Sequence, residues 1–270
     1  MSSFPSPAAP PPQSRAALAS ALCRTMAAIH RRGWCDGTGG NFSCVLSPPP
    51  ELRLLMAPSG VDKGRVRPSQ LIVVAADGTV LQGEGRCSAE MQLHRTIVES
   101  TAAGAVLHTH SQAATLLSRL ACPAETDRTA TDASGVRPTV PQPAFLEIEG
   151  LEMLKGLEGI STHQSRIRLP VLPNDQDLSR LSAACRPHLA AAPHGLLIAG
   201  HGLYAWGADL VQAQRHLEIL EFLLEQQWRE QLWRLMAGPH GSASTDQQEL
   251  SSKPRHWPGG RGPSPHPFLR

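Results

Sequence analysis

Lysine is scarce in this sequence. Three of the 25 basic residues are lysines, namely Lys63, Lys155 and Lys253. Schiff-base chemistry needs a lysine that is desolvated in a pocket, so few candidates exist for it. An excess of charge of one sign is also lacking, because 25 basic residues are balanced by 23 acidic ones and the formal net charge is +2. This balance indicates neither a nucleic acid nor an acidic surface as the partner.

Long hydrophobic runs and paired cysteines are missing as well. No stretch reaches the roughly 20 apolar residues that a bilayer span needs, which excludes a membrane protein. The first 13 residues have neither the basic nor the apolar region of a secretory signal. The six cysteines form no Cys-x-x-Cys pair, so we expect reduced thiols and no disulfide framework. Together these absences predict a cytoplasmic protein.

Two tails rich in proline, glycine and serine flank the part of the chain that can fold. Residues 1–13 and 238–270 have too few apolar side chains to offset the entropy lost on ordering, and we expect both to be disordered. Residues 14–237 fit a single domain. Within it, residues 121–142 have no hydrophobic periodicity and predict a surface insertion.

Hydrophobic periodicity predicts helices that alternate with short strands. Apolar steps of three and four indicate helices at 16–32, at 88–100 with Ser88 as its cap, at 177–191 and at 209–236. Short apolar runs indicate strands at 51–57, 71–75, 104–110 and 195–199. This alternation predicts a layered α/β domain.

Two histidines, His108 and His110, end one of the apolar strands. Side chains alternate along a strand, so both imidazoles leave the same face and can chelate a divalent metal such as zinc. The alternative is a packed or surface histidine pair. His201, between Gly200 and Gly202, follows another buried strand and offers a third ligand, or else a solvated side chain in a turn. Three histidines with an open fourth position make the catalytic type of zinc site.

Two glycine-rich turns, residues 37–43 and 58–63, offer backbone N–H groups, hydroxyls and one ammonium. Successive N–H donors in such turns form anion nests that suit a phosphate. Neither turn is a Walker loop or a dinucleotide fingerprint, so each can also be an ordinary turn. The helix N-terminus expected at Ser88 would add a dipole and a hydroxyl to the same anion.

Five segments, taken in order, resemble the class II aldolase/adducin family: GTGGNFS, APSGVDKG, CSAE, GAVLHTHS and GHGLYAWG. Residues 149–158, 172–177 and 201–207 further resemble the branch that dehydrates 5-methylthioribulose 1-phosphate. The resemblance implies an α/β domain with a central, mainly antiparallel β-sheet flanked by helices. It also implies a hydro-lyase of methionine salvage that forms 2,3-diketo-5-methylthiopentyl 1-phosphate, holds one Zn²⁺ per subunit and assembles as a homotetramer.

The resemblance assigns roles to single residues. It implies metal binding by His108, His110 and His201. It implies Glu152 as the catalytic acid/base. Glu90 is the competing candidate, because the family's sugar-phosphate aldolases keep a catalytic carboxylate at the position of Glu90. Without such roles, Glu90 would interact with a helix dipole and Glu152 would lie on a solvated helix face. The substrate-handling positions that it implies are Gly40, Asn41, Ser59, Gly60, Lys63, Cys87 and Ser88. Gly39 replaces a serine that is common in the family.

Two other functions stay open at this point. One is a sugar-phosphate aldolase or epimerase on the same scaffold, and the other is a non-catalytic, adducin-like interaction domain, against which the three retained histidines argue. Imidazoles also suit iron or manganese.

The apolar side chains of the helix at 209–236 surround its circumference, which predicts a homo-oligomer unless all of them pack within their own subunit. These side chains are Ile219, Leu220, Phe222, Leu223, Trp228 and Trp233.

Overall fold

The computed structural model describes residues 14–123 and 143–237. Both predicted tails and residues 124–142 of the predicted insertion lie outside the described residues. Residues 121–123 end a helix and begin the segment that follows it. The limits of the predicted domain therefore stay a prediction.

Five α-helices and two 3₁₀ turns lie in the described residues: α1 (Arg15–Arg31), η1 (Pro68–Gln70), α2 (Met91–Thr101), α3 (Gln112–Ala121), η3 (Glu152–Gly156), α4 (Leu178–Leu189) and α5 (Leu210–Ala237). The predicted helices are confirmed. Gly33, with φ +71°, follows the end of α1, and the Asp177 carboxylate caps α4 by accepting from Ser179 N. The cap predicted at Ser88 is wrong, because α2 begins at Met91 and the Ser88 hydroxyl accepts from the backbone N–H of Glu90 within the preceding turn.

A nine-stranded sheet forms the centre of the described fold. Its strands are β1 (Asn41–Ser47), β2 (Arg53–Met56), β3 (Ile72–Ala75), β4 (Val80–Gln82), β5 (Ala105–Thr109), β6 (Ala144–Glu149), β7 (Arg166–Leu172), β8 (Gly195–Ile198) and β9 (Gly202–Gly207). The spatial order is β4-β3-β2-β1-β5-β9-β8-β7-β6. The pair β7–β8 is parallel and every other pair is antiparallel, so the predicted mainly antiparallel sheet is confirmed.

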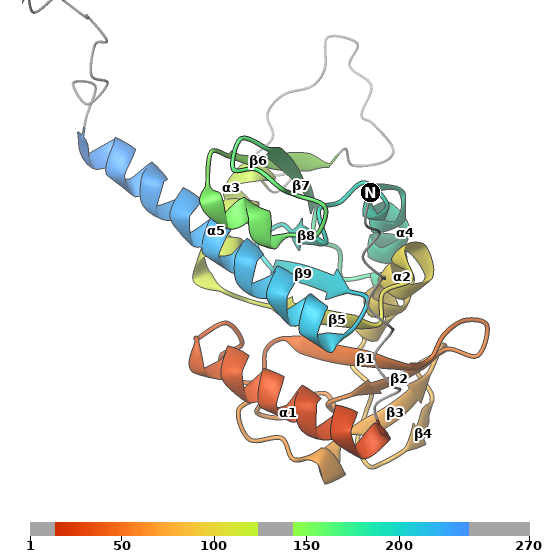
Figure 1. The fold of residues 1–270 in the computed structure, drawn as a ribbon. Coiled ribbons are helices and arrows are strands. Elements are labelled where there is room, and N and C mark those ends of the chain that lie inside the picture. The colour runs from red at the N-terminus through yellow and green to blue at the C-terminus, as the bar shows by residue number, and fades with distance from the viewer. Residues whose placement is uncertain (1–13, 124–142, 238–270) are drawn as a thin grey trace, which may run out of the picture. The chain divides into compact units, whose positions relative to one another are not determined.

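Helices cover both faces of this sheet and create two hydrophobic cores. Side chains of α1, α3 and α5 pack in one core, and side chains of α2 and α4 pack in the other. Figure 1 shows α1 and α5 on one side of the sheet, with α2 and α4 on the other. The strands divide their side chains by alternation, so that in β5 Ala105 and Leu107 enter the first core and Val106 the second. Polar residues that continue β5 are consequently directed to opposite faces.

The long helix α5 uses much of its apolar surface inside its own chain. Ile219, Leu220 and Leu223 are buried in the first core, whereas Phe222 is 41% exposed. Packing within the subunit therefore accounts for part of the apolar surface of α5. Phe222 stays exposed for contact with another subunit.

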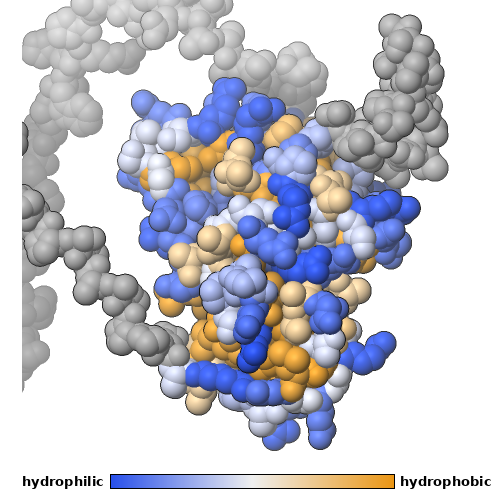
Figure 2. Space-filling view, turned by 90° about the vertical axis from the view of Figure 1, so that its right-hand side faces the viewer, coloured by the Kyte–Doolittle hydropathy of each residue, from blue (hydrophilic) through white to orange (hydrophobic). Residues whose placement is uncertain are grey.

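The surface mixes polar and apolar side chains. Figure 2 shows hydrophilic residues scattered over one face, with hydrophobic residues gathered toward the end that holds β1 to β4. Among residues 14–123 and 143–237, no helix has both the length and the hydropathy that a membrane span requires.

Candidate metal centre and anion pocket

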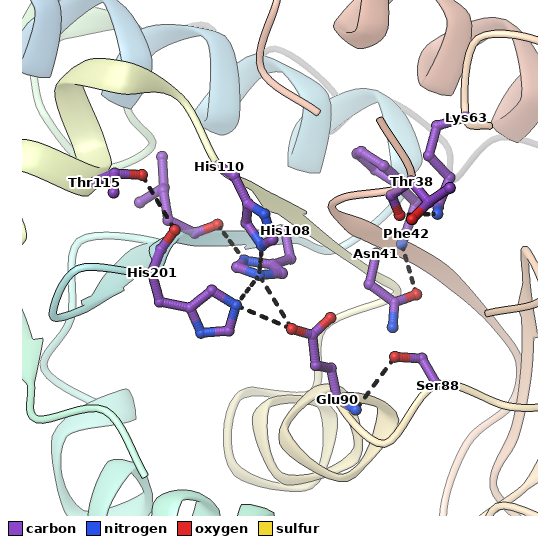
Figure 3. A network of polar contacts seen from close by, with 11 residues as sticks. Thr38, Asn41, Phe42, Lys63, Ser88, Glu90, His108, His110, Thr115 and His201 are labelled. Atoms are coloured by element: carbon purple, nitrogen blue, oxygen red, sulfur yellow. Dashed lines mark hydrogen bonds and ion pairs between the residues drawn. The ribbon is translucent and has the colours of Figure 1, made fainter. Parts of the chain in front are cut away.

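Three histidines from two parts of the chain meet at the end of β5. Strand alternation places His108 and His110 on one face, with their Nε2 atoms 2.8 Å apart. His201 lies in the turn between β8 and β9, and its Nε2 is 3.3 Å from His108 Nε2. Antiparallel pairing of β5 with β9 brings this turn beside β5 (Figure 3). Three imidazole nitrogens therefore converge on one point.

Glycines allow the turn that carries His201 to approach β5. Gly200 has φ +63°, a region that L side chains avoid. A Cβ at Gly202 would lie 1.9 Å from the Thr109 carbonyl oxygen, so only glycine fits there. The turn is also tied to α3, because the Thr115 hydroxyl donates to the His201 carbonyl oxygen at 3.2 Å.

The orientation of His108 is set by two contacts. Its Nδ1–H donates to the Leu203 carbonyl oxygen at 2.9 Å, which leaves Nε2 as the lone-pair donor. The Tyr204 ring stacks on the imidazole, with the ring planes 11° apart. The backbone N–H of His110 is also fixed, because it donates to the Trp34 carbonyl oxygen at 2.7 Å.

A carboxylate completes the cluster. Glu90 Oε1 lies 3.0 Å from His201 Nε2 and 3.6 Å from His108 Nε2. The four ligand atoms all lie within 4.8 Å of one another. Three imidazoles and a carboxylate make a donor set that suits zinc, and also iron or manganese.

The protonation states also suit a cation. Burial lowers the pKa of His108 and lowers that of His110 to about 4, so both imidazoles are neutral at pH 7. Burial opposes ionisation of Glu90, but the adjacent imidazoles of His108 and His201 hold its pKa well below the usual range. Neutral imidazole and ionised carboxylate are the forms that ligate metals. The buried Nδ1 of His201 has no hydrogen-bond partner among the described residues.

A cavity of about 290 Å³ adjoins this cluster. Its walls are the two predicted glycine-rich turns, the start of β1 and the residues before α2, and it shares Glu90 and His110 with the cluster. Its lining comprises Thr38, Gly39, Gly40, Asn41, Pro58, Ser59, Gly60, Lys63, Ser88, Glu90 and His110. Six of the seven residues expected to handle the substrate therefore share one cavity with Glu90 and His110 of the cluster.

Lys63 and Asn41 supply donors to this cavity. Lys63 is 3% exposed, and its ammonium donates to the carbonyl oxygens of Thr38 and Val61, which links the two turns. Burial lowers its pKa. The buried Asn41 Nδ2 has no partner among the described residues, while Oδ1 accepts from the N–H of Phe42 (Figure 3). An unpaired buried amide donor indicates a ligand with acceptor oxygens.

Two positions of the first turn require glycine, because a Cβ atom there would come too close to its neighbours. Gly40 has φ +76°, and a Cβ there would lie 2.8 Å from the His108 carbonyl oxygen. A Cβ at Gly39 would lie 2.9 Å from His110 Nδ1. The His110 ring therefore fills the space that a serine at position 39 would need.

Glu152 and Cys87 are not brought to the cluster. Glu152 begins η3, its side chain is 70% exposed, and its carboxylate contacts Lys155 and His163. The hydrogen bond from Lys155 lowers the Glu152 pKa. Cys87 contacts Met56 and the Ser88 carbonyl oxygen and does not line the cavity.

Sequence reasoning missed Tyr204, Thr38 and Glu221 near the site. No local sequence pattern marked Tyr204 or Thr38 as site residues, because their contacts depend on strands and turns that meet only in the fold. Glu221 did carry one, since it lies on the apolar stripe formed by Leu217, Leu220 and Leu224, where a carboxylate is unexpected.

The comparison with known proteins agrees with this geometry. Residues 20–228 match the Class II Aldolase and Adducin N-terminal domain, and the chain belongs to this family. The family resemblance expected from the sequence is confirmed. The chain is 41% identical over 210 residues to the methylthioribulose-1-phosphate dehydratase of Acidiphilium cryptum, covering 77% of this chain and 89% of the relative. It is 40% identical over 200 residues to the enzyme of the same name from Pseudomonas fluorescens, covering 73% and 85%.

Solved structures confirm the fold. L-fuculose-1-phosphate aldolase from Thermus thermophilus superposes with a TM-score of 0.58 at 22% identity, covering 82% of this chain and 98% of that one. A sugar-phosphate aldolase from Thermotoga maritima gives 0.54 at 17% identity, covering 80% and 96%. At such identities the likeness is one of fold.

Proposed function

We propose that this protein is a metal-dependent hydro-lyase that dehydrates 5-methylthioribulose 1-phosphate in methionine salvage. The observation that carries the proposal is the junction of the His108–His110–His201 cluster with the anion cavity, which shares Glu90 and His110. Relatives named methylthioribulose-1-phosphate dehydratase, 37–41% identical over most of the chain, support this substrate.

The metal proposed is one Zn²⁺ per subunit, held by the three histidines. The donor set and the neutral imidazoles support a divalent cation. When bound, a divalent metal supplies a Lewis acid that draws charge from the substrate's C2 carbonyl and makes the C3 proton more acidic. Glu90 either adds a fourth ligand or faces the reacting carbons.

The phosphate of the substrate would occupy the cavity between the two turns. Lys63 supplies positive charge, Asn41 Nδ2 supplies an unused donor, and the backbone turns beside the cavity at Gly60, with φ +77°. Ser59, Ser88 and Gly40 line the same space. Anchoring the phosphate there positions C3 and C4 next to the cluster. The binding of the phosphate thereby orients the reacting carbons.

The dehydration removes a proton from C3 and the hydroxyl from C4, and the resulting enol becomes the second ketone of the product. A carboxylate must take the C3 proton, and a carboxylic acid must protonate the leaving hydroxyl so that it departs as water. Our candidate for this shuttle is Glu152. Its exposed position within its own chain supports a role at the metal centre of a neighbouring copy.

A homotetramer in the cytoplasm is the assembly and location that we propose. The half-exposed Phe222 on α5 and the exposed Met153 beside Glu152 support contacts with another copy. Five free cysteines, namely Cys23, Cys35, Cys44, Cys87 and Cys185, support a reducing compartment.

A sugar-phosphate aldolase is the second candidate, and the contact of Glu90 with His201 favours it. Incubating the purified protein with 5-methylthioribulose 1-phosphate separates the two. Formation of the diketone with loss of water supports the dehydratase. Release of a triose phosphate or an aldehyde from sugar phosphates, without dehydration, would replace it by the aldolase. His201→Ala is the matched control for contaminating activity.

A further inference from the structure

A carboxylate is buried behind the metal centre. Glu221 of α5 is 2% exposed and lies on the helix stripe that enters the first hydrophobic core. Burial raises its pKa to about 7, and hydrogen bonds from Ser111 and Thr109 oppose that shift. A carboxylate in an apolar core is costly, so its presence calls for an explanation in what it contacts.

The contacts of Glu221 lie on either side of a metal-binding histidine. The Thr109 hydroxyl donates to Glu221 Oε1 at 2.5 Å, and Ser111 lies near enough to the same carboxylate to lower its pKa. Thr109 precedes His110 and Ser111 follows it. Because side chains alternate along β5, the Thr109 hydroxyl leaves the face opposite to the imidazole of His108. The Glu221 carboxylate therefore contacts the histidine-bearing segment on the face opposite to the His108 imidazole.

The same segment is restrained at both ends. The backbone N–H of His110 donates to the Trp34 carbonyl oxygen, and the Ser111 hydroxyl accepts from Ala114 N as the cap of α3. Glu221 connects these local restraints to α5, an element more than one hundred residues later in the chain. No contact between Glu221 and the imidazoles themselves is present among the described residues.

We propose that Glu221 is a positioning residue, which sets the geometry of the metal-binding histidines by accepting the hydroxyl of Thr109, the residue between them. The inference rests on the metal centre of the proposed function. A carboxylate accepts hydrogen bonds through either oxygen, whereas the amide of glutamine offers one oxygen, and its N–H₂ cannot accept from the Thr109 hydroxyl. The isosteric change Glu221→Gln therefore disturbs the segment while keeping its volume.

The test measures Zn²⁺ affinity of the full chain by competition with a chromogenic chelator, together with the visible absorption spectrum of the Co²⁺-loaded protein. We expect Glu221→Gln to weaken Zn²⁺ binding by about 10-fold or more, the scale seen when support of a metal ligand is lost, and to alter the Co²⁺ spectrum. Glu225→Gln, one turn along α5 where the side chain pairs with Arg229, is the matched control and should bind Zn²⁺ like the parent.

Variants at Thr109 keep the test decisive if Glu221→Gln folds poorly. Thr109→Val removes the hydroxyl at nearly constant volume and should weaken Zn²⁺ binding, and Thr109→Ser should restore it. Parent-like Zn²⁺ affinity and Co²⁺ spectra in both Glu221→Gln and Thr109→Val would overturn the proposal. A parent protein that binds no divalent metal would overturn the metal centre and this role with it. Tight metal binding without dehydration would reject only the substrate, and the Glu221 measurements would still decide its role.

Discussion

The phenol ring of Tyr204 lies flat against the imidazole of His108, with the ring centroids 3.8 Å apart. The two residues are cross-strand partners on β9 and β5, so the sheet itself creates the stack. Tyr204 is fully buried, and its hydroxyl has no hydrogen-bond partner among the described residues. The ring supports His108, the proposed metal ligand, and the hydroxyl adds a desolvation cost.

The first prediction follows from that hydroxyl. Tyr204→Phe keeps the stacked ring and removes a buried, unpaired polar group, whose burial costs about 1–3 kcal/mol. We expect the free energy of unfolding in urea to stay equal or to rise by about 1 kcal/mol, with metal affinity unchanged. A loss of more than about 1 kcal/mol would indicate that the hydroxyl has a partner.

The second prediction concerns the three histidines. His108→Ala, His110→Ala and His201→Ala should each lower bound metal and activity together, because a three-histidine centre has no spare imidazole. Metal analysis of each purified variant beside its rate checks this. A variant that keeps stoichiometric metal and normal turnover would show that its histidine is not a ligand.

The third prediction separates the two carboxylates. Glu152→Gln keeps shape and hydrogen-bonding reach but cannot titrate, so metal content and substrate affinity should persist while turnover falls by about 10²-fold or more. Glu90→Gln should mainly weaken metal binding, because Glu90 contacts His201 and His108 directly. If Glu152→Gln works at the parent rate while Glu90→Gln is inactive with full metal, the catalytic role moves to Glu90.

The fourth prediction concerns assembly. Light scattering at micromolar concentration should give about four times the chain mass of 29.0 kDa. If Glu152 acts on a neighbouring copy, oligomers reassembled from inactive Glu152→Gln and inactive His201→Ala chains should regain activity, because one copy supplies the metal centre and the other the carboxylate. A mass near 29.0 kDa would contradict the tetramer. Mixtures that stay inactive would contradict the action of Glu152 on a neighbouring copy.

The fifth prediction is a pH dependence. Burial raises the pKa of the Cys87 thiol to about 11, so the reactive thiolate is the minor form at neutral pH. Alkylation of Cys87 by iodoacetamide should therefore be slow at pH 7 and accelerate by about tenfold per pH unit as the pH rises toward that pKa. Peptide mass spectrometry after timed labelling measures this rate at each pH. Rapid labelling at pH 7 would show that the Cys87 thiol is already ionised there and would contradict the raised pKa.

The sequence by itself determined the local features of this protein. Period-two alternation placed His108 and His110 on one face, and apolar steps of three and four located the helices, because these patterns follow from backbone geometry within a few residues. Strands β1, β4, β6, β7 and β9 were not predicted. β4 is only three residues long, and β1 begins within residues 37–43, whose sequence indicated only a turn. Each of these strands is stabilised by partner strands that are distant in the chain.

Only the tertiary structure decided which of these features meet. His201 reaches His108 across 93 positions through the β5–β9 pairing, and Glu221 reaches Thr109 across 112 positions from a helix on the other face. It also decided that Glu90, and not Glu152, lies beside the histidines of its own chain. Such contacts depend on strand register and layer packing, which are set by the burial of side chains from the whole sheet and not by any local pattern.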